Sequence, residues 1–439
     1  FCADPWLYRH LASIPGVRSE PPPKLGMARI RLKIRGLLAR SSVTFSMVRA
    51  CLSMRAQRLP PSGGPWLVVY GHPSSDANGR DGYFGDLMLS MPQLHRILHV
   101  DCAPGRAREL CKDGRTISLH GFGNPLYALS LCLRRWRLPA SAVAGPDTWL
   151  IRRALETDNG FAGAAMIAWQ VHCQRRWLAQ HKPERVFWPW ENHGWERTFC
   201  RDLRRAGIRS FGYQHSVVGD QWNLGPASNP DGAASLPDTI ICNGDSGRRQ
   251  LSGAGHSAER LTVGGTLRSL SPAMIPWESQ APVFVALPFD LEVAHQMVDA
   301  CRQIAGRRFV VRKHPMTPLD FTATGNIAHA DGPLSEQKVV AAVIYAATTV
   351  GLEAWMAGLP TIRFRPDGYI AIDILPNDVE VRAATAATLG DVLENAIDGG
   401  AETARDDGIF SPVDTRIWTG YADPDHSPST APEREETLP

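Results

Sequence analysis

The sequence lacks three features that would each point to a particular class of protein. Its nine cysteines form no CxxC pair and are scattered along the 439 residues, which fits reduced thiols better than a zinc site or a disulfide framework. No run approaches the roughly 18 to 20 apolar residues that a membrane-spanning helix needs. The opening string FCADPWLYRHLAS has no apolar core of a secretion signal. We therefore expect the protein to stay in the cytoplasm.

Charge of one sign is missing from an N-terminal stretch. The whole chain has a net charge of +3, and nucleic-acid binding is not expected because its basic residues accompany no RNA or DNA motif. Between Glu20 and Asp76, however, there is no acidic residue and there are nine basic ones, interleaved with apolar side chains. Residues 24–58 therefore form either a contact with an anionic membrane surface, which would make the protein peripheral on the inner membrane, or a solvated helix pair on the first domain.

Expected strands and helices alternate over most of the remaining chain, which indicates parallel α/β domains. The Gly- and Pro-rich residues 217–238 separate two such alternations, and a cleft between the halves would be the usual place for a ligand. From about residue 403 Pro, Ser, Thr and Asp dominate, a composition typical of disorder. We expect a basic amphipathic segment (1–60), two α/β domains (61–230 and 231–402) and a disordered tail (403–439).

The string RRFVVRKHPMTPLD places three basic residues directly after a buried strand. Parallel strands deliver such residues to the sheet edge where ligands bind. Thr317, Pro318 and Asp320 have the chemistry of an N-cap, N1 and N3 of a new helix, whose free amides attract anions. With Lys313-His314-Pro315 beside them, a phosphate site is predicted. The alternative is a His-Pro turn packed against a neighbour.

Two further strings have the chemistry of a nucleotide site. In VIYAATTVGLEAWMAGLP an apolar strand runs into Thr348-Thr349, whose hydroxyls could hold a phosphate oxygen, and Glu353 one turn later could accept hydrogen bonds from a ribose. The alternative is a capped helix with an exposed Glu. In RLTVGGTLR, Gly265 and Thr266 follow a strand, and a glycine turn there would let a ligand approach the backbone.

In the first half, FWPWENHGWERTF puts Glu191 at the end of a buried strand among Trp188, Trp190 and Trp195. An apolar cage raises the pKa of a carboxylate, which suits acid or base work on a sugar hydroxyl, and Trp190 offers a face to a sugar ring. The alternative is a Glu paired with Arg197 or Arg201. We expect Glu196 to face solvent or to pair on its helix.

FGYQHSVVGD ends another strand in Gln214-His215. His215 could steady a sugar carboxylate or phosphate and Gln214 could bond a hydroxyl, or the histidine could satisfy buried backbone. Asp220, Asp238 and Asp245 are candidate nucleophiles if the reaction retains configuration. A loop with Asp76, Asp81 and Asp86, after His72-Pro73, could border an acceptor site.

The order strand-Gly-Gly-Thr, strand-Lys-His-Pro, then Thr-Thr-x-Gly-x-Glu-Ala-x-x-x-Gly-x-Pro resembles the C-terminal half of GT-B glycosyltransferases. The resemblance is nearest to bacterial surface-polysaccharide transferases that use CMP-sugars, including Kdo and sialic acid transferases, and it covers roughly residues 180 to 365. It implies two Rossmann-like domains facing a central cleft, with the acceptor on the first and the donor nucleotide on the second. Lys313, His314, Pro315, Thr348 and Thr349 would then hold the donor, where many relatives carry Ser in place of the two Thr.

The resemblance implies transfer of an acidic sugar, first of all Kdo, from CMP to a saccharide or glycolipid acceptor in capsule or lipopolysaccharide synthesis. GT-B enzymes commonly use basic residues and helix dipoles, and no Asp-x-Asp string follows an expected strand, so we expect no essential metal and no cofactor. A CDP-glycerol-type phosphotransferase, with His72 or His215 as its catalytic histidine, is the first rival. A nucleotide-sugar 2-epimerase would need an acidic cluster that is not evident, and a non-catalytic scaffold docked on membranes is the rival from another class.

Overall fold

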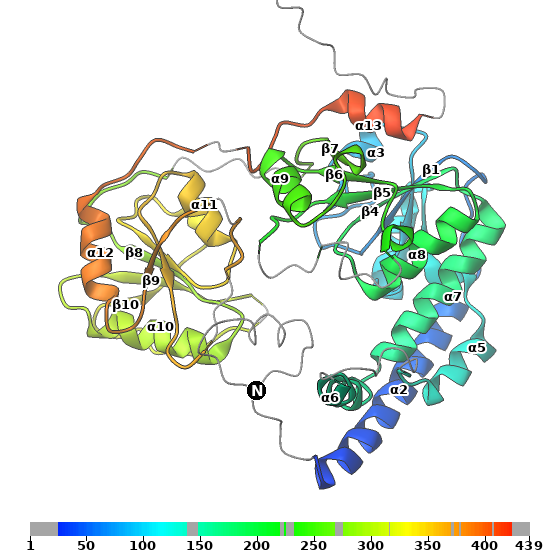
Figure 1. The fold of residues 1–439 in the computed structure, drawn as a ribbon, viewed down its shortest axis with the longest axis horizontal. Helices are drawn as coiled ribbons and strands as arrows, with labels where there is room; N and C mark the ends of the chain where they lie inside the picture. The colour runs from blue at the N-terminus through cyan, green and yellow to red at the C-terminus, as the bar shows by residue number, and fades with distance from the viewer. Residues whose placement is uncertain are drawn as a thin grey trace, which may run out of the picture. The chain divides into compact units, whose positions relative to one another are not determined.

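Two parallel β-sheets, each flanked by helices, form the protein (Figure 1). The computed structural model describes residues 25–137, 148–219, 224, 232–267, 275–315, 317–369, 373–376, 379–405 and 408–423. The expected fold class, α/β with two Rossmann-type parallel sheets, is confirmed by the strand orders. Among the described residues, no helix combines the length and the apolar character needed to cross a bilayer.

The first sheet has seven strands in the order β3-β2-β1-β4-β5-β6-β7. Its registered pairs are parallel; Trp66 of β1, for example, lies opposite His95 of β2 and Val186 of β4. Strands β1 and β4 are fully buried, and all their residues except Arg185 are apolar, as expected in a sheet covered on both faces. The strands are β1 (Pro65–Val69), β2 (His95–Leu98), β3 (Thr116–Ser118), β4 (Arg185–Pro189), β5 (Arg209–Gln214), β6 (Thr239–Cys242) and β7 (Leu261–Val263).

Helices of very different length accompany this sheet. In the longest after the first, Trp169, Cys173 and Trp177 recur every four residues and are all buried, because residues four apart share one face of a helix. The helices are α2 (Met27–Met54), α3 (Leu87–Ser90), α4 (Pro104–Leu110), α5 (Pro125–Ser130), α6 (Thr148–Asp158), α7 (Gly163–His181), α8 (Gly194–Arg205) and α9 (Asp245–Gly253), with short 3-10 turns η1 (Cys111–Asp113), η2 (Leu119–Phe122), η3 (Leu131–Leu133), η6 (Gly232–Ser235) and η7 (Ala258–Arg260).

The second sheet has six strands in the order β10-β9-β8-β11-β12-β13. Apolar residues of β8, β9 and β11 pack with the inner faces of its helices into one buried cluster, which includes Val283, Val285 and Met297. The strands are β8 (Val283–Ala286), β9 (Phe309–Arg312), β10 (Ile327–His329), β11 (Val343–Tyr345), β12 (Thr361–Phe364) and β13 (Arg382–Ala384); the helices are α10 (Leu291–Gln303), α11 (Val350–Met356) and α12 (Leu389–Asp398), with the 3-10 turn η8 (Leu334–Glu336).

The first sheet extends further along the chain than the sequence suggests. A second domain was expected to begin at residue 231, but β6 and β7 lie beside β5 in the seven-stranded sheet. Strand-helix alternation looks the same on both sides of residue 231, so the pattern cannot show which sheet a strand joins. Residues 232–263 therefore belong, by strand order, to the first sheet.

The chain also returns to the first sheet near its end. The expectation of disorder from residue 403 is wrong for α13 (Thr415–Ala422), which Asp414 caps through the backbone amide of Arg416. Trp418 is 1% exposed, and its indole N–H donates to the carbonyl of Gly264, 2.9 Å away, just after β7. One buried aromatic residue thus orders a segment whose composition predicts disorder.

Candidate active site

The second sheet brings two of the predicted strings to one edge. The first strand of this sheet, β8, lies in its middle. The chain adds β9 and β10 on one side of β8 and then β11, β12 and β13 on the other, so the strand order reverses at β8. Ligands of such sheets bind outside the carboxyl ends of the strands at that reversal. Lys313-His314-Pro315 follows β9 and Thr348-Thr349 follows β11, so the two strings flank the end of β8.

Contacts within the chain already occupy part of the Lys-His-Pro string. Lys313 Nζ lies 3.0 Å from Asp320 Oδ1, and the ring of His314 packs edge-on against Phe289 with their centroids 5.6 Å apart. Burial, with Arg312 nearby, lowers the pKa of His314. At neutral pH the histidine is therefore a neutral hydrogen-bonding group, and the phosphate charge would have to be met by other groups.

The helix expected after His314 does not form, which corrects that part of the prediction. Residues 317–324 contain no helix, and the hydroxyl of Thr317 donates to the carbonyl of Phe289 at 2.7 Å. Leu319 is buried and Phe321 packs against the same apolar cluster, which holds this stretch extended on its way to β10. Local capping chemistry is overridden here by tertiary packing, and residues 317–324 supply no helix amides beside Lys313.

The Thr-Thr string does begin a helix. Thr349 is the N-cap residue of α11, but its side chain makes no capping hydrogen bond. Thr349 is exposed and Thr348 is half-buried, so both hydroxyls stand where a ligand could reach them. Position 351 requires a glycine for packing, because a Cβ there would lie 2.6 Å from the ring of Tyr345.

Glu353 lies one turn into α11 and is partly buried. Burial raises its pKa, while Arg312 at the end of β9 opposes that rise. Arg312 and Glu353 thus link the two strings electrostatically at the same sheet edge. A carboxyl group in this position can accept hydrogen bonds from hydroxyl groups.

Gly265 and Thr266 are not part of this edge. They follow β7 in the first sheet. The close approach that Gly265 permits, at a φ of 80°, is made by the chain itself: a Cβ would lie 2.1 Å from the carbonyl oxygen of Pro412. The backbone amide of Thr266 donates to the carbonyl of Ser411. In the described residues this turn holds the segment that leads to α13.

In the first sheet, Glu191 and His215 meet after the ends of β4 and β5. Glu191 Oε1 lies 3.4 Å from His215 Nε2, and the two side chains are 23% and 4% exposed. The carboxylate is therefore the member of the pair that solvent can reach. A histidine beside a carboxylate is the arrangement that orients proton-transfer groups in many enzymes. His215 is thus one partner of Glu191.

The tryptophans around Glu191 belong to the core. Trp188, Trp190 and Trp195 are 0%, 2% and 4% exposed, so the expectation that Trp190 offers its face to a sugar ring is not supported by its position. Glu196 is 1% exposed, which corrects the expectation that it faces solvent. Its carboxylate accepts from the indole N–H of Trp188 at 2.9 Å and from the backbone amide of His193 at 3.1 Å.

Gln214 is also committed to the fold. It is 2% exposed, its amide donates to the carbonyl of Ser216, and its oxygen accepts from the backbone amide of Asn243. It nevertheless lines a small hollow together with Trp190, Glu191, Ser216, Val217, Val218 and Leu224. Asp245 pairs with Arg248 at 3.0 Å at the start of α9, and Asp220 lies outside the described residues.

The acid-rich loop after β1 serves its own structure. Asp81 is buried and accepts hydrogen bonds from the backbone amides of Tyr83 and Phe84, while its second oxygen lies 3.4 Å from Arg96. Asp76 accepts from two amides of its own turn. The expectation that this loop presents carboxylates to an acceptor is therefore not supported for these two residues.

Sequence reasoning missed a polar group after β2. His99 Nδ1 lies 3.1 Å from Asp101 Oδ2, and the hydrogen bond to His99 lowers the pKa of Asp101, as do the nearby His120 and His193. Asp101 is exposed, and β2 and β4 both neighbour β1. The signal that could have found it is the string ILHVDC, in which a buried strand ends in His and Asp.

No family model matches the chain, and no match was found among curated proteins. Solved structures do show similarity. The apo form of the lipopolysaccharide outer core galactosyltransferase WaaB gives a TM-score of 0.39 at 11% identity, over 77% of this chain and 92% of that one. A UDP-GlcNAc 2-epimerase from Methanocaldococcus jannaschii gives 0.45 at 10%, over 79% and 96%. MurG from Acinetobacter baumannii gives 0.40 at 11%, over 77% and 91%. At such identities the similarity says nothing about substrate.

Proposed function

We propose that the protein is a GT-B-type glycosyltransferase that moves an acidic sugar, Kdo in our first choice, from a CMP donor to a saccharide or glycolipid acceptor of capsule or lipopolysaccharide. The observation that carries the proposal is the edge of the second sheet, where the strings after β9 and β11 flank the end of β8. That place and these residue types suit a nucleotide phosphate. The choice of CMP and Kdo rests on the resemblance of the motifs alone.

In this proposal the accessible groups after β11 take the donor phosphate. Thr348 and Thr349 offer hydroxyl donors, and His314, neutral through its lowered pKa, can donate one further hydrogen bond. Lys313 would have to exchange Asp320 for the phosphate, which is feasible because Asp320 is fully exposed and exposed ion pairs contribute little. Glu353 would hold ribose hydroxyls. Such a site accelerates the reaction by stabilising the negative charge that develops on the departing phosphate.

Glu191 is the proposed base. In a direct displacement, the acceptor hydroxyl oxygen forms a bond to the anomeric carbon and its proton passes to the Glu191 carboxylate. The bond from that carbon to the phosphate oxygen breaks, and CMP leaves with the electron pair. His215, buried beside Glu191, would position the carboxylate.

The test is transfer from CMP-Kdo to a lipopolysaccharide-type acceptor by the purified chain. Glu191→Gln should lose transfer while retaining nucleotide affinity, because the substitution removes the proton acceptor and keeps the shape. Glu259→Gln is the matched control, since Glu259 is exposed in η7, and it should leave both unchanged. Full transfer by Glu191→Gln, or loss of nucleotide binding in it, would refute the assignment.

The Glu191–His215 pair favours one second candidate. A CDP-glycerol-type phosphotransferase would use His215 as its base, with Glu191 orienting the ring. The low exposure of His215 speaks for the first choice. The two are separated by offering CDP-glycerol in place of CMP-Kdo: transfer of glycerol phosphate that fails in His215→Asn would establish the rival.

A further inference from the structure

The first helix presents an apolar face to solvent. Leu38, Phe45 and Leu52 of α2 are 65%, 63% and 55% exposed. They are seven residues apart, or about two turns, and so share one face. At about 100° per residue, the buried members of α2, among them Arg40, Met47 and Met54, lie on the opposite side. The helix thus buries one face and leaves a second apolar face without a partner among the described residues.

Positive charge accompanies this face. Arg31 and Arg49 are exposed and fall beside the apolar stripe by the same helical geometry. The sequence has no acidic residue between Glu20 and Asp76 to balance them. A surface of exposed Leu and Phe framed by arginines is complementary to an anionic lipid interface, which takes apolar side chains into its acyl boundary and cations at its headgroups.

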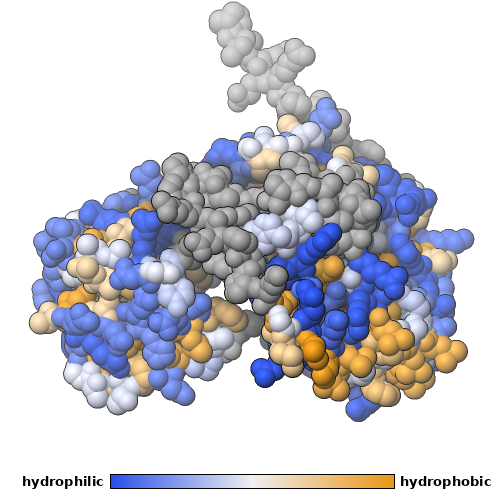
Figure 2. All heavy atoms as spheres, turned by 60° about the horizontal axis from the view of Figure 1, so that its bottom comes forward, coloured by the Kyte–Doolittle hydropathy of each residue, from blue (hydrophilic) through white to orange (hydrophobic). Residues whose placement is uncertain are grey.

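Elements that pack against α2 expose further apolar side chains. Helix α2 packs against α5 and η3, where Leu126, Leu129 and Leu133 are 76%, 44% and 75% exposed. The next residues are Arg134 to Arg137, all exposed, with Trp136 among them. Figure 2 shows hydrophobic residues gathered at the lower right, beside hydrophilic ones, where these helices lie in Figure 1. Tryptophan beside arginine is the composition that membrane interfaces favour.

The exposed segment is held in place by buried polar contacts. Arg40, 1% exposed, donates from Nε to the carbonyl of Cys132 at 3.1 Å and from a terminal nitrogen to that of Asn159 at 2.9 Å. Asn159 in turn accepts from the backbone amide of Trp136 at 2.8 Å. The leucines and Trp136 are therefore presented by an anchored scaffold.

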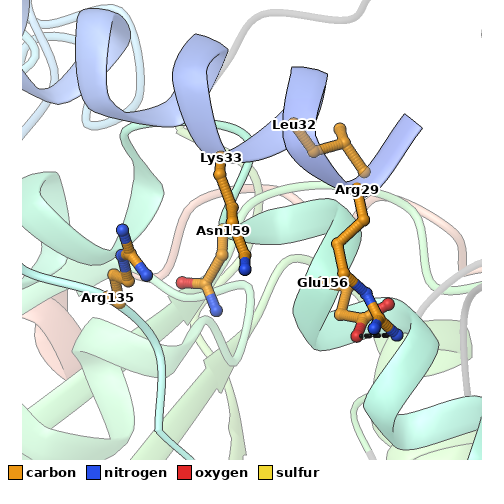
Figure 3. Close-up of a pocket in the computed structure, with 6 residues that line it drawn as sticks. All are labelled: Arg29, Leu32, Lys33, Arg135, Glu156 and Asn159. Atoms are coloured by element: carbon orange, nitrogen blue, oxygen red, sulfur yellow. Dashed lines mark ion pairs between the residues drawn. The ribbon is translucent and has the colours of Figure 1, made fainter. Parts of the chain in front are cut away.

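A hollow between α2 and α6 adds a place for a headgroup (Figure 3). Arg29, Lys33 and Arg135 line it, and Glu156 is the single carboxylate, paired with Arg29 at 2.6 Å. In the part of the chain that the structure describes, Lys33 and Arg135 make no ion pair. Two cations beside an exposed Leu-Trp segment suit the phosphate of an anionic lipid.

We propose that α2, α5, η3 and residues 134–137 form a docking surface for an anionic lipid bilayer, with Lys33 and Arg135 receiving a lipid phosphate. The surface is larger than residues 24–58, which the sequence singled out. The proposal does not depend on the sugar, the donor or the reaction, so failure of the transfer assay leaves it intact.

Sedimentation with vesicles tests the docking surface on the full chain. The wild type should sediment with vesicles containing phosphatidylglycerol and far less with vesicles of phosphatidylcholine alone, and added salt should weaken the binding. The triple variant Leu38→Gln, Phe45→Gln and Leu52→Gln should bind at least about tenfold more weakly, because it loses three apolar side chains that would enter the bilayer. The variant Lys33→Gln with Arg135→Gln should show a smaller preference for phosphatidylglycerol, because it loses two of the cations of the surface.

The matched control is Leu89→Gln with Leu291→Gln, two leucines that are 51% and 46% exposed elsewhere on the chain. It should bind vesicles as the wild type does. Equal binding by the triple variant, or no binding of the wild type to either vesicle, would overturn the proposal. Sedimentation equilibrium tests whether a second copy of the chain covers this face instead. If the wild type does not bind vesicles and is a dimer that becomes a monomer in the triple variant, the face is an interface between two copies.

Discussion

Replacing Gly265 with alanine should destabilise the protein far more than the same change at a comparable glycine. Gly265 and Gly207 have φ angles of 80° and 69°, a region that costs an L-residue about 1–2 kcal/mol. Around Gly207 nothing lies within 4 Å of an added Cβ, whereas at Gly265 the Cβ would lie 2.1 Å from the carbonyl oxygen of Pro412. Only Gly265→Ala must therefore displace the segment that leads to α13.

The size of the extra effect follows from what that segment holds. Its displacement would break the hydrogen bond from Trp418 to Gly264, worth about 1 kcal/mol, and expose a tryptophan that is 1% exposed. Loss of such a side chain from a core costs about 3–5 kcal/mol. Partial displacement should thus add about 2–4 kcal/mol to the cost shared with Gly207→Ala.

Thermal unfolding of both variants beside the wild type is the assay. Each kcal/mol lowers Tm by about 2–4 °C in domains of this size, so Gly265→Ala should show at least twice the shift of Gly207→Ala. Hydrogen exchange should also become faster in residues 415–422 of Gly265→Ala alone. Equal shifts for the two variants would refute the packing role of Gly265. A loss of nucleotide affinity with unchanged Tm would restore the donor-binding role predicted from the sequence.

Two further predictions concern buried charge in the first sheet. Arg96→Met should destabilise the fold by about 3–5 kcal/mol, because it leaves the buried carboxylates of Asp81 and Asp113 without the guanidinium that lies 3.4 and 3.2 Å from them. Urea unfolding measures this loss of stability, and a loss below about 1 kcal/mol would contradict the prediction. Burial lowers the pKa of His120 to about 4, against about 6.5 in an unfolded chain. The unfolded state therefore takes up this proton first as the pH falls, so stability that is complete above pH 6.5 declines toward pH 4, by about 3 kcal/mol in all. His120→Gln should show a flatter decline between these pH values, and an identical pH profile would argue against the burial of this imidazole.

Much of the fold could be predicted from local sequence. Short apolar runs predict buried strands such as Val283–Ala286 and Val343–Tyr345. Because the strands pair in parallel, the residues that follow them lie at one edge of the sheet. That is why the string after β9 could be predicted to lie at a ligand-binding edge, whereas Gly265 and Thr266, predicted for the same donor site, follow β7 in the first sheet.

The predictions that were wrong or missing concern features that contacts between distant residues determine. Thr317 and Pro318 have the chemistry of a helix start, yet packing of Leu319 and Phe321 keeps the chain extended. α13 depends on Trp418 reaching Gly264, 154 positions earlier. The pairing of Glu191 with His215 depends on β4 and β5 being neighbours, which strand periodicity does not reveal.

The exposed apolar face of α2 is a further feature that the sequence predicts only in part. The basic and apolar composition of residues 24–58 was visible in the sequence. Which of its apolar residues are buried follows only from how α2 packs on α5 and η3. The structure thus turns a statement about composition into one about a particular surface.

The measurement that tests the central claim most directly is the stabilisation of the chain by nucleotides. CMP, CDP, UMP, UDP and GDP would be compared by thermal unfolding, where a ligand at ~100 times its Kd adds about 2.7 kcal/mol. The account predicts the largest Tm rise with CMP, its loss in His314→Ala and in the double variant Thr348→Val with Thr349→Val, and its retention in Glu191→Gln. A preference for UDP or GDP would contradict the CMP donor, and no rise with any nucleotide would contradict a donor site at the edge of the second sheet.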